Sequence, residues 1–277
     1  MPDMDMLATG LDHPEGVAWD PGGSLIAGGE AGQIYEVDPG TGAVHERAST
    51  GGFLFGVTPG PGGSVMGCDF GRAELVRIGA DGDVASLSRG TEADPLRVPN
   101  FAAYGEDGTL YLTDSGTWGE DDGSIFRVGA DGSTQVWSRE APAFPNGCCL
   151  TAEGDALLVV ESRARRVVRI PIAENGAARP PTVVSDLTGS QPDGVALAAD
   201  GTMFVGCYRP DRIWRIPPGG EPEIWAEDAD GVVLNQPANV AFFGPDLDRL
   251  VISSLGGWNL MTADPGVTGL PLRIPSV

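Results

Sequence analysis

Lysine is absent from this chain of 277 residues, whose 17 basic residues are all arginines. Without a side-chain amine, Schiff-base catalysis is excluded. Histidine is scarce, and His13 and His45 are too few for a His-based zinc centre of the common kinds. A Ser-His-Asp triad would have to recruit one of them. We expect His45 on the surface of an outer strand and His13 in a packing or supporting role near Glu15.

Cysteine, long apolar runs and positive charge are also in short supply. We expect the four cysteines to be reduced thiols with no disulfide and no catalytic part. No stretch approaches the roughly 20 apolar residues of a membrane span. Residues 1–10 lack the basic start and apolar core of a signal peptide, so we expect a cytoplasmic protein.

The net charge of −22 argues against nucleic acid or an anionic membrane as a partner. We expect a small-molecule substrate and a monomer or small homo-oligomer. No Pro/Gly/Ser-rich linker divides the chain, so one domain is expected over residues 1–277.

A cassette made of an anchor residue, an apolar stretch, a turn and a second strand recurs six times. The gaps between successive anchors are 40, 45, 46, 47 and 46 residues. The anchors are Glu15, Phe55, Asn100, Asn146, Asp193 and Asn239. A repeat of this length built from short strands is typical of a propeller blade. The predicted fold class is therefore all-β, a six-bladed β-propeller with four antiparallel strands per blade.

The end of the chain and its beginning are expected to complete one blade together. The sixth cassette lacks a fourth strand, whereas residues 6–11 precede the first anchor as residues 183–187 precede the fifth. We therefore predict that the N-terminal segment closes the ring as the outer strand of the last blade, which removes an exposed sheet edge.

Radial repetition brings the anchors toward one axis on one face. Four of them, Glu15, Asn100, Asn146 and Asp193, carry oxygen ligands, and Asn239 is a possible fifth. Two carboxylates with two or more amide carbonyls suit a hard divalent cation. We expect Ca²⁺, with Zn²⁺, Mn²⁺ or Mg²⁺ as other options. The alternative is that the anchors cap turns around a water-filled tunnel, but the residue type varies while the position does not.

Several segments resemble the gluconolactonase and senescence marker protein (regucalcin) family. They are residues 13–20 (HPEGVAWD), 145–147 (PNG), 191–196 (QPDGVA), 239–242 (NVAF) and 244–247 (GPDL). Diisopropyl fluorophosphatase and paraoxonase are more distant six-bladed relatives. The resemblance extends from the first anchor to about residue 254, and it implies a metal-dependent hydrolase of a small lactone or ester.

The resemblance also implies roles for single residues. The family holds its cation with a Glu of the first blade, an Asn of the fourth and an Asp of the fifth, which correspond to Glu15, Asn146 and Asp193. The third-blade Asn, here Asn100, contacts the metal or the substrate. Asp193 is expected to act as general base as well as ligand.

The chain departs from sugar lactonases at one recognition residue. Those enzymes carry an Arg two residues before the third-blade Asn, whereas Val98 stands there in this chain and Arg97 comes one residue earlier. Phe55 and Phe101 also make the mouth more apolar than expected for a sugar site.

Loops on the anchor face supply the remaining candidates. For substrate contact they are Asn100, Arg97, Phe55, Trp118, Glu120, Tyr208 and Trp258. For supporting the ligands they are His13, Asp114, Glu161 and Asn239. Trp118 and Trp258 are either core residues or pocket walls. Asp114 and Glu161 either orient ligands or cap loops.

A cation with open positions polarises a carbonyl and activates water, so hydrolysis needs no Ser or Cys nucleophile. We expect Asp193 to serve as general base in such a reaction. The alternatives are a phosphotriester or fluorophosphate hydrolase on the same site, a noncatalytic small-molecule-binding propeller, and a condensing enzyme of the strictosidine synthase type.

Overall fold

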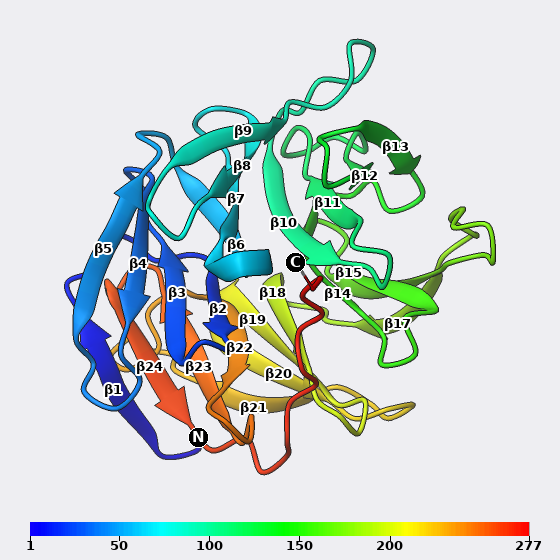
Figure 1. Cartoon of the computed structure of the whole chain (residues 1–277). Coiled ribbons are helices and arrows are strands. Elements are labelled where there is room, and N and C mark those ends of the chain that lie inside the picture. The colour runs from blue at the N-terminus through cyan, green and yellow to red at the C-terminus, as the bar shows by residue number, and fades with distance from the viewer. Residues whose placement is uncertain (277) are drawn as a thin grey trace.

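The computed structural model describes residues 1–276, in which 24 strands form six sheets of four antiparallel strands. Figure 1 shows these sheets as blades around a central axis, with the innermost strand of each blade nearest the centre. The predicted fold class is confirmed.

The bounds of the strands follow the repeat. The innermost strands are β2 (Val17–Asp20), β6 (Leu54–Pro59), β10 (Pro99–Tyr104), β14 (Pro145–Leu150), β18 (Gln191–Leu197) and β22 (Pro237–Phe243). The second strands are β3 (Ser24–Gly28), β7 (Val65–Asp69), β11 (Leu110–Asp114), β15 (Ala156–Glu161), β19 (Met203–Arg209) and β23 (Arg249–Ser254). The third strands are β4 (Gln33–Val37), β8 (Glu74–Ile78), β12 (Ser124–Val128), β16 (Arg166–Pro171), β20 (Asp211–Ile216) and β24 (Asn259–Ala263). The outer strands are β5 (Val44–Ser49), β9 (Val84–Ser88), β13 (Thr134–Ser138), β17 (Thr182–Asp186), β21 (Glu223–Glu227) and β1 (Met4–Thr9).

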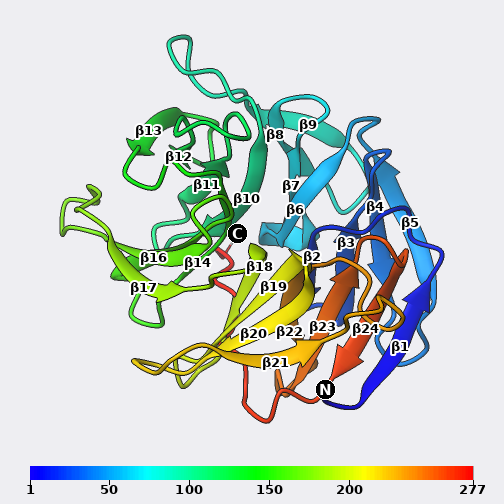
Figure 2. The same cartoon turned by 180° about the vertical axis from the view of Figure 1, so that it is seen from behind.

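We number the blades 1 to 6 from β2–β5 to the blade of β22–β24. Strand β1 pairs antiparallel with β24, so the N-terminal strand completes blade 6 as predicted. Figure 2 shows β1 beside β24 at the rim of the ring. The short 3-10 turn η1 (Pro61–Gly63) joins β6 to β7. Within residues 1–276, no helix has the length and apolar character needed to cross a membrane.

The core lies between neighbouring blades. In β3, Leu25 and Ala27 pack into a cluster shared with blade 6, whereas Ile26 packs into a cluster shared with blade 2. Alternate side chains of a strand point to opposite faces of its sheet. Both faces of each blade are therefore buried, which explains why the inner and second strands are nearly continuous in apolar residues.

The C-terminal segment after β24 crosses the end of the axis where the inner strands finish (Figure 1). Leu270 N donates to Leu197 O (2.9 Å), and the Arg273 guanidinium donates to Glu106 and to Ala152 O. An apolar cavity of about 290 Å³ lies beneath this segment. The anchors do not line this cavity, which therefore belongs to the half of the axis opposite the candidate site.

Candidate active site

Irregular pairing places the anchors at the axis. In blades 2 to 6, the register between the inner and second strands shifts at the anchor. Such a β-bulge leaves a residue without a ladder partner and redirects its side chain. Glu15 comes just before β2, where Gly16 O accepts a hydrogen bond from Gly28 N (3.1 Å). The anchors are thus held at equivalent points of six blades.

A glycine follows four of the anchors because the next blade approaches too closely for a side chain. A Cβ on Gly16 would lie 2.2 Å from Phe55 O, and one on Gly194 would lie 2.2 Å from Asn239 Oδ1. Neighbouring anchors therefore touch around the axis. The recurring glycine of the cassette is a packing requirement of the ring.

Hydroxyl groups join the blades where this glycine is missing. In blade 3, Thr113 Oγ1 donates to Asn146 O (2.8 Å), and in blade 6, Ser253 Oγ donates to Glu15 O (2.6 Å). Both hydroxyls are fully buried. The backbone of two candidate ligands is therefore fixed from the neighbouring blade.

Two carboxylates dominate the electrostatics of the axis. Burial raises the pKa of Asp193 to about 7, and the neighbouring Asn146 amide offsets part of that rise. Burial, and then the charge of Asp193, raises the pKa of Glu15 well above its ordinary value. Among residues 1–276, no Arg or His forms an ion pair with either group. The pair therefore lacks a compensating positive charge.

The amide anchors differ in what their oxygens can bind. Asn146 Nδ2 donates to Ser162 Oγ (3.2 Å), which leaves the carbonyl oxygen available as a ligand. Asn100 is buried in the same ring. Asn239 Oδ1 instead accepts from Val240 N (3.0 Å), so the suggested fifth ligand is engaged by the backbone. Oxygen donors around two uncompensated carboxylates fit a hard divalent cation.

Buried acids at the ends of second strands hold the loops that lead to the anchors. Asp114 accepts from Arg97 N (2.6 Å) and Val98 N (3.2 Å), just before Asn100. Glu161 accepts from Ala143 N (3.0 Å), just before the blade 4 anchor. These acids cap loops, and through the loops they set where the anchors lie.

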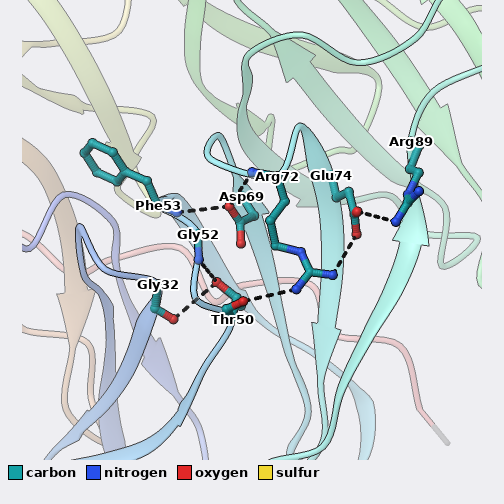
Figure 3. Close-up of polar contacts among 8 residues, drawn as sticks. All are labelled: Gly32, Thr50, Gly52, Phe53, Asp69, Arg72, Glu74 and Arg89. Atoms are coloured by element: carbon teal, nitrogen blue, oxygen red, sulfur yellow. Dashed lines mark hydrogen bonds and ion pairs between the residues drawn. The ribbon is translucent and has the colours of Figure 1, made fainter.

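A third acid of this kind, Asp69, was not identified from the sequence. It accepts from Phe53 N (3.0 Å), two residues before Phe55, and its side chain is fully buried (Figure 3). Its position in the repeat could have identified it, because Asp69, Asp114 and Glu161 are each the last residue of a second strand.

The Arg97 side chain is engaged by another residue of the same chain. Its guanidinium donates to Asp122 Oδ2 (2.5 Å) and Asp122 O (2.6 Å), and so it anchors the loop of residues 115–123. On this loop Glu120 is exposed, and Trp118 is 50% exposed with its ring edge-on to Phe144 (4.8 Å). Trp118 is therefore a surface aromatic of the anchor face and not a core residue.

His13 and Trp258 lie together where blades 6 and 1 meet. Their ring centroids are 4.6 Å apart, and His13 Nδ1 is 2.7 Å from Glu30 Oε2. Trp258 is 48% exposed. Tyr208 is half-buried, and burial, followed by the charges of Asp193 and Glu15, raises its pKa to about 12. Tyr208 thus lies close to the carboxylate pair. His45 is exposed on β5, as expected.

Comparisons with known proteins agree with this architecture. Residues 8–256 match the family described as SMP-30/Gluconolactonase/LRE-like region. The chain is 30% identical over 258 residues to a pentonolactonase of Haloferax volcanii, covering 88% of this chain and 81% of that protein.

Solved structures share the fold at lower identity. A gluconolactonase of Xanthomonas campestris superposes with a TM-score of 0.81 at 19% identity, covering 94% of this chain and 89% of that one. A calcium-binding regucalcin of Agrobacterium tumefaciens superposes with a TM-score of 0.75 at 19% identity, covering 100% and 94%.

Proposed function

Since the chain belongs to the SMP-30/gluconolactonase/LRE-like family, we propose that it hydrolyses a small lactone or ester at the axial carboxylates Glu15 and Asp193. The observation that carries the proposal is this acid pair, of which Asp193 is buried and Glu15 half-buried. Among residues 1–276 neither acid forms an ion pair with Arg or His, and amide anchors surround the pair. The relative from Haloferax volcanii, a pentonolactonase, supports the same reaction class. The free thiols of all four cysteines support a reducing compartment, the cytoplasm, as its location.

A divalent cation, calcium in the first place, is proposed to complete the site. Glu15, Asp193, Asn146 and Asn100 would hold it, and their two negative charges would balance it. The regucalcin with the same fold is described as a calcium-binding protein. When bound, such a cation supplies Lewis-acid polarisation of the substrate carbonyl and lowers the pKa of water.

Asp193 is proposed to move the proton. Asp193 is buried at the axis beside Asn146, and a carboxylate in this place can act as a general base. One of its carboxylate oxygens accepts a proton from water as the water oxygen attacks the lactone carbonyl carbon. The same proton passes to the ring oxygen as the C–O bond breaks, which releases the hydroxy acid. Burial keeps the proton affinity of Asp193 high, and the bulge of β18 holds its position.

The test combines chelation with a matched pair of substitutions. We expect chelation to abolish hydrolysis of δ-lactones and added Ca²⁺, Mg²⁺, Mn²⁺ or Zn²⁺ to restore it. Asp193→Asn should keep the β-rich circular dichroism spectrum and lose roughly 10²- to 10⁴-fold in kcat. The control, Asp246→Asn in an exposed turn of blade 6, should keep wild-type turnover.

Each outcome refutes a different part of the proposal. Activity that survives complete metal removal refutes the cation, and an active Asp193→Asn variant refutes the base. Turnover of phosphotriesters alone, or of no ester at all, refutes the lactonase assignment.

A further inference from the structure

Blade 2 has an aromatic cluster where the other blades have polar anchors. The rings of Phe55 and Phe70 stack with centroids 5.0 Å apart and an interplanar angle of 4°. Phe53 meets Phe55 edge-on at 5.0 Å and lies 6.0 Å from Phe70. Phe70 is 40% exposed, so the cluster presents an apolar wall to solvent. We call these three residues the blade 2 wall.

The wall adjoins the candidate active site. Phe55 occupies the bulge of its inner strand, as the polar anchors do in blades 3 to 6. Its carbonyl oxygen lies against Gly16, next to Glu15, and the following Gly56 lies against the carbonyl of Asn100. Phe55 therefore stands between two of the proposed cation ligands in the order around the axis.

Hydrogen bonds fix the two loops that carry the outer rings. Asp69 Oδ1 accepts from Phe53 N and from Arg72 N, each at 3.0 Å (Figure 3). Phe70 N donates to Phe53 O at 2.8 Å. A Cβ on Gly71 would lie 2.7 Å from Phe53 N, so the loops touch. The Asp69 carboxylate thus joins the loop of Phe53 to the loop of Phe70 and Arg72.

Charged groups extend this support toward the outside of the blade. Arg72 donates to Thr50 O (3.1 Å), on the loop before the wall, and reaches Glu74 Oε2 at 3.4 Å. Arg89 pairs with Glu74 Oε1 at 2.6 Å (Figure 3). Glu74 is buried, so this chain of contacts is shielded from solvent on one side. These contacts tie the loop before the wall and the loop of Phe70 to the outer strands of the blade.

The chemistry of such a wall discriminates between substrates. Burying apolar area against it is favourable in proportion to the area removed from water. A hydroxyl placed against the same rings loses its hydrogen bonds to water and gains none. The wall therefore favours an alkyl or aryl substituent over the hydroxyls of a sugar ring.

We propose that the substrates of this enzyme are lactones with an apolar substituent, which the blade 2 wall binds, and that Asp69 is a positioning residue for this wall. The proposal rests on the lactonase function proposed above. It assigns Phe55 and Phe70 to substrate selection and leaves the reaction at Asp193 unchanged.

The kinetic test compares two lactones with the same ring on the cation-loaded protein. We expect KM for δ-decalactone, which carries a pentyl chain, to be at least about tenfold lower than KM for δ-valerolactone. Phe70→Ala should raise KM for δ-decalactone about tenfold more than it raises KM for δ-valerolactone. Ile224→Ala, on the exposed face of β21, is the control and should change neither.

Asp69 is tested by a conservative pair. Asp69→Ala removes the acceptor for Phe53 N and Arg72 N and should abolish the preference for δ-decalactone. Asp69→Asn keeps that acceptor and should retain the preference. A purely structural role would instead lower kcat for both lactones together. Equal KM values for the two lactones, or a lower KM for glucono-δ-lactone than for δ-decalactone, overturn the proposal while the lactonase function stands.

Binding of lactams tests the proposed wall independently of the proposed lactonase activity. The two matching lactams resist hydrolysis, and calorimetry measures their affinity whether or not any lactone is turned over. We expect the pentyl-substituted lactam to bind at least about tenfold more tightly than the unsubstituted one, and Phe70→Ala to remove the difference. Equal affinity of wild-type protein for the two lactams refutes the wall as a binding surface.

Discussion

Removing the charge of Asp193 should stabilise the cation-free protein, and the gain should grow with pH. Burial raises the pKa of Asp193 from 3.8 to about 7. A shift of roughly 3 pKa units corresponds to about 4 kcal/mol between the charged and neutral forms. Because the pKa is higher in the folded state, the stability linked to this group is present below about pH 4 and is lost as the pH rises through about 7.

The expected size of the effect follows from this window. Between about pH 5 and pH 8, the free energy of unfolding of the cation-free wild-type protein should fall by about 3 kcal/mol. The free energy of unfolding of Asp193→Asn should not show this fall. For a domain of this size, about 1 kcal/mol corresponds to roughly 2 °C in Tm. The Tm of the variant should therefore rise by about 6 °C relative to wild type over this range. The raised pKa of Glu15 acts in the same direction.

The assay is thermal unfolding in chelator at several pH values, with Asp246→Asn as the control that should follow wild type. Calcium should remove most of this difference, since a cation at about 100 times its Kd adds about 2.7 kcal/mol to wild type and little to Asp193→Asn. A wild-type Tm that falls no faster with pH than the Tm of the variant refutes the assignment of a buried, uncompensated acid pair.

Three further predictions concern the ring and its thiols. Gly16→Ala should destabilise the protein by about 1–3 kcal/mol in urea unfolding, because the added Cβ meets Phe55 O; equal stability of this variant and of Gly40→Ala, in an open turn, contradicts the packing argument. Ser253→Ala should cost about 1–3 kcal/mol and lower calcium affinity, since Glu15 O loses its donor; calorimetry that shows unchanged affinity contradicts this role. Cys68, Cys148 and Cys207 are buried, and the pKa of the partly exposed Cys149 thiol is raised to about 12 by burial. A disulfide reagent at pH 8 should therefore react slowly until the protein unfolds, and a fast burst from the folded protein contradicts this shielding.

The ring could be predicted because its signal repeats. A gap of about 46 residues, with an anchor and a turn at constant offsets, tells one fold from another more reliably than any single strand does. The missing outer strand of blade 6 was found from the same comparison, and β1 supplies it. The positions of Glu15, Asn146 and Asp193 on one face follow from the ring alone.

The surroundings of the site could not be predicted in the same way, because they depend on contacts between loops of different length. Arg97 reaches Asp122, 25 residues away, on the loop of residues 115–123, which is longer than the loops between the second and third strands of the other blades. The stacking of Phe55 on Phe70 joins an inner strand to the turn after β7. Asp69 is different, because it ends its second strand as Asp114 and Glu161 do, so the repeat already carried the signal for it.

Blade 2 shows that the ring accepts an apolar residue at an anchor position. The bulges and interblade contacts set the place of each anchor, and they involve backbone atoms and glycines more than the anchor side chains. An anchor can therefore be polar or apolar at little cost to the fold. Holding the charges of Glu15 and Asp193 side by side without a positively charged partner is costly. Phe55 carries no such penalty, so substitution at this anchor alters the shape and polarity of the mouth while the acid pair remains intact.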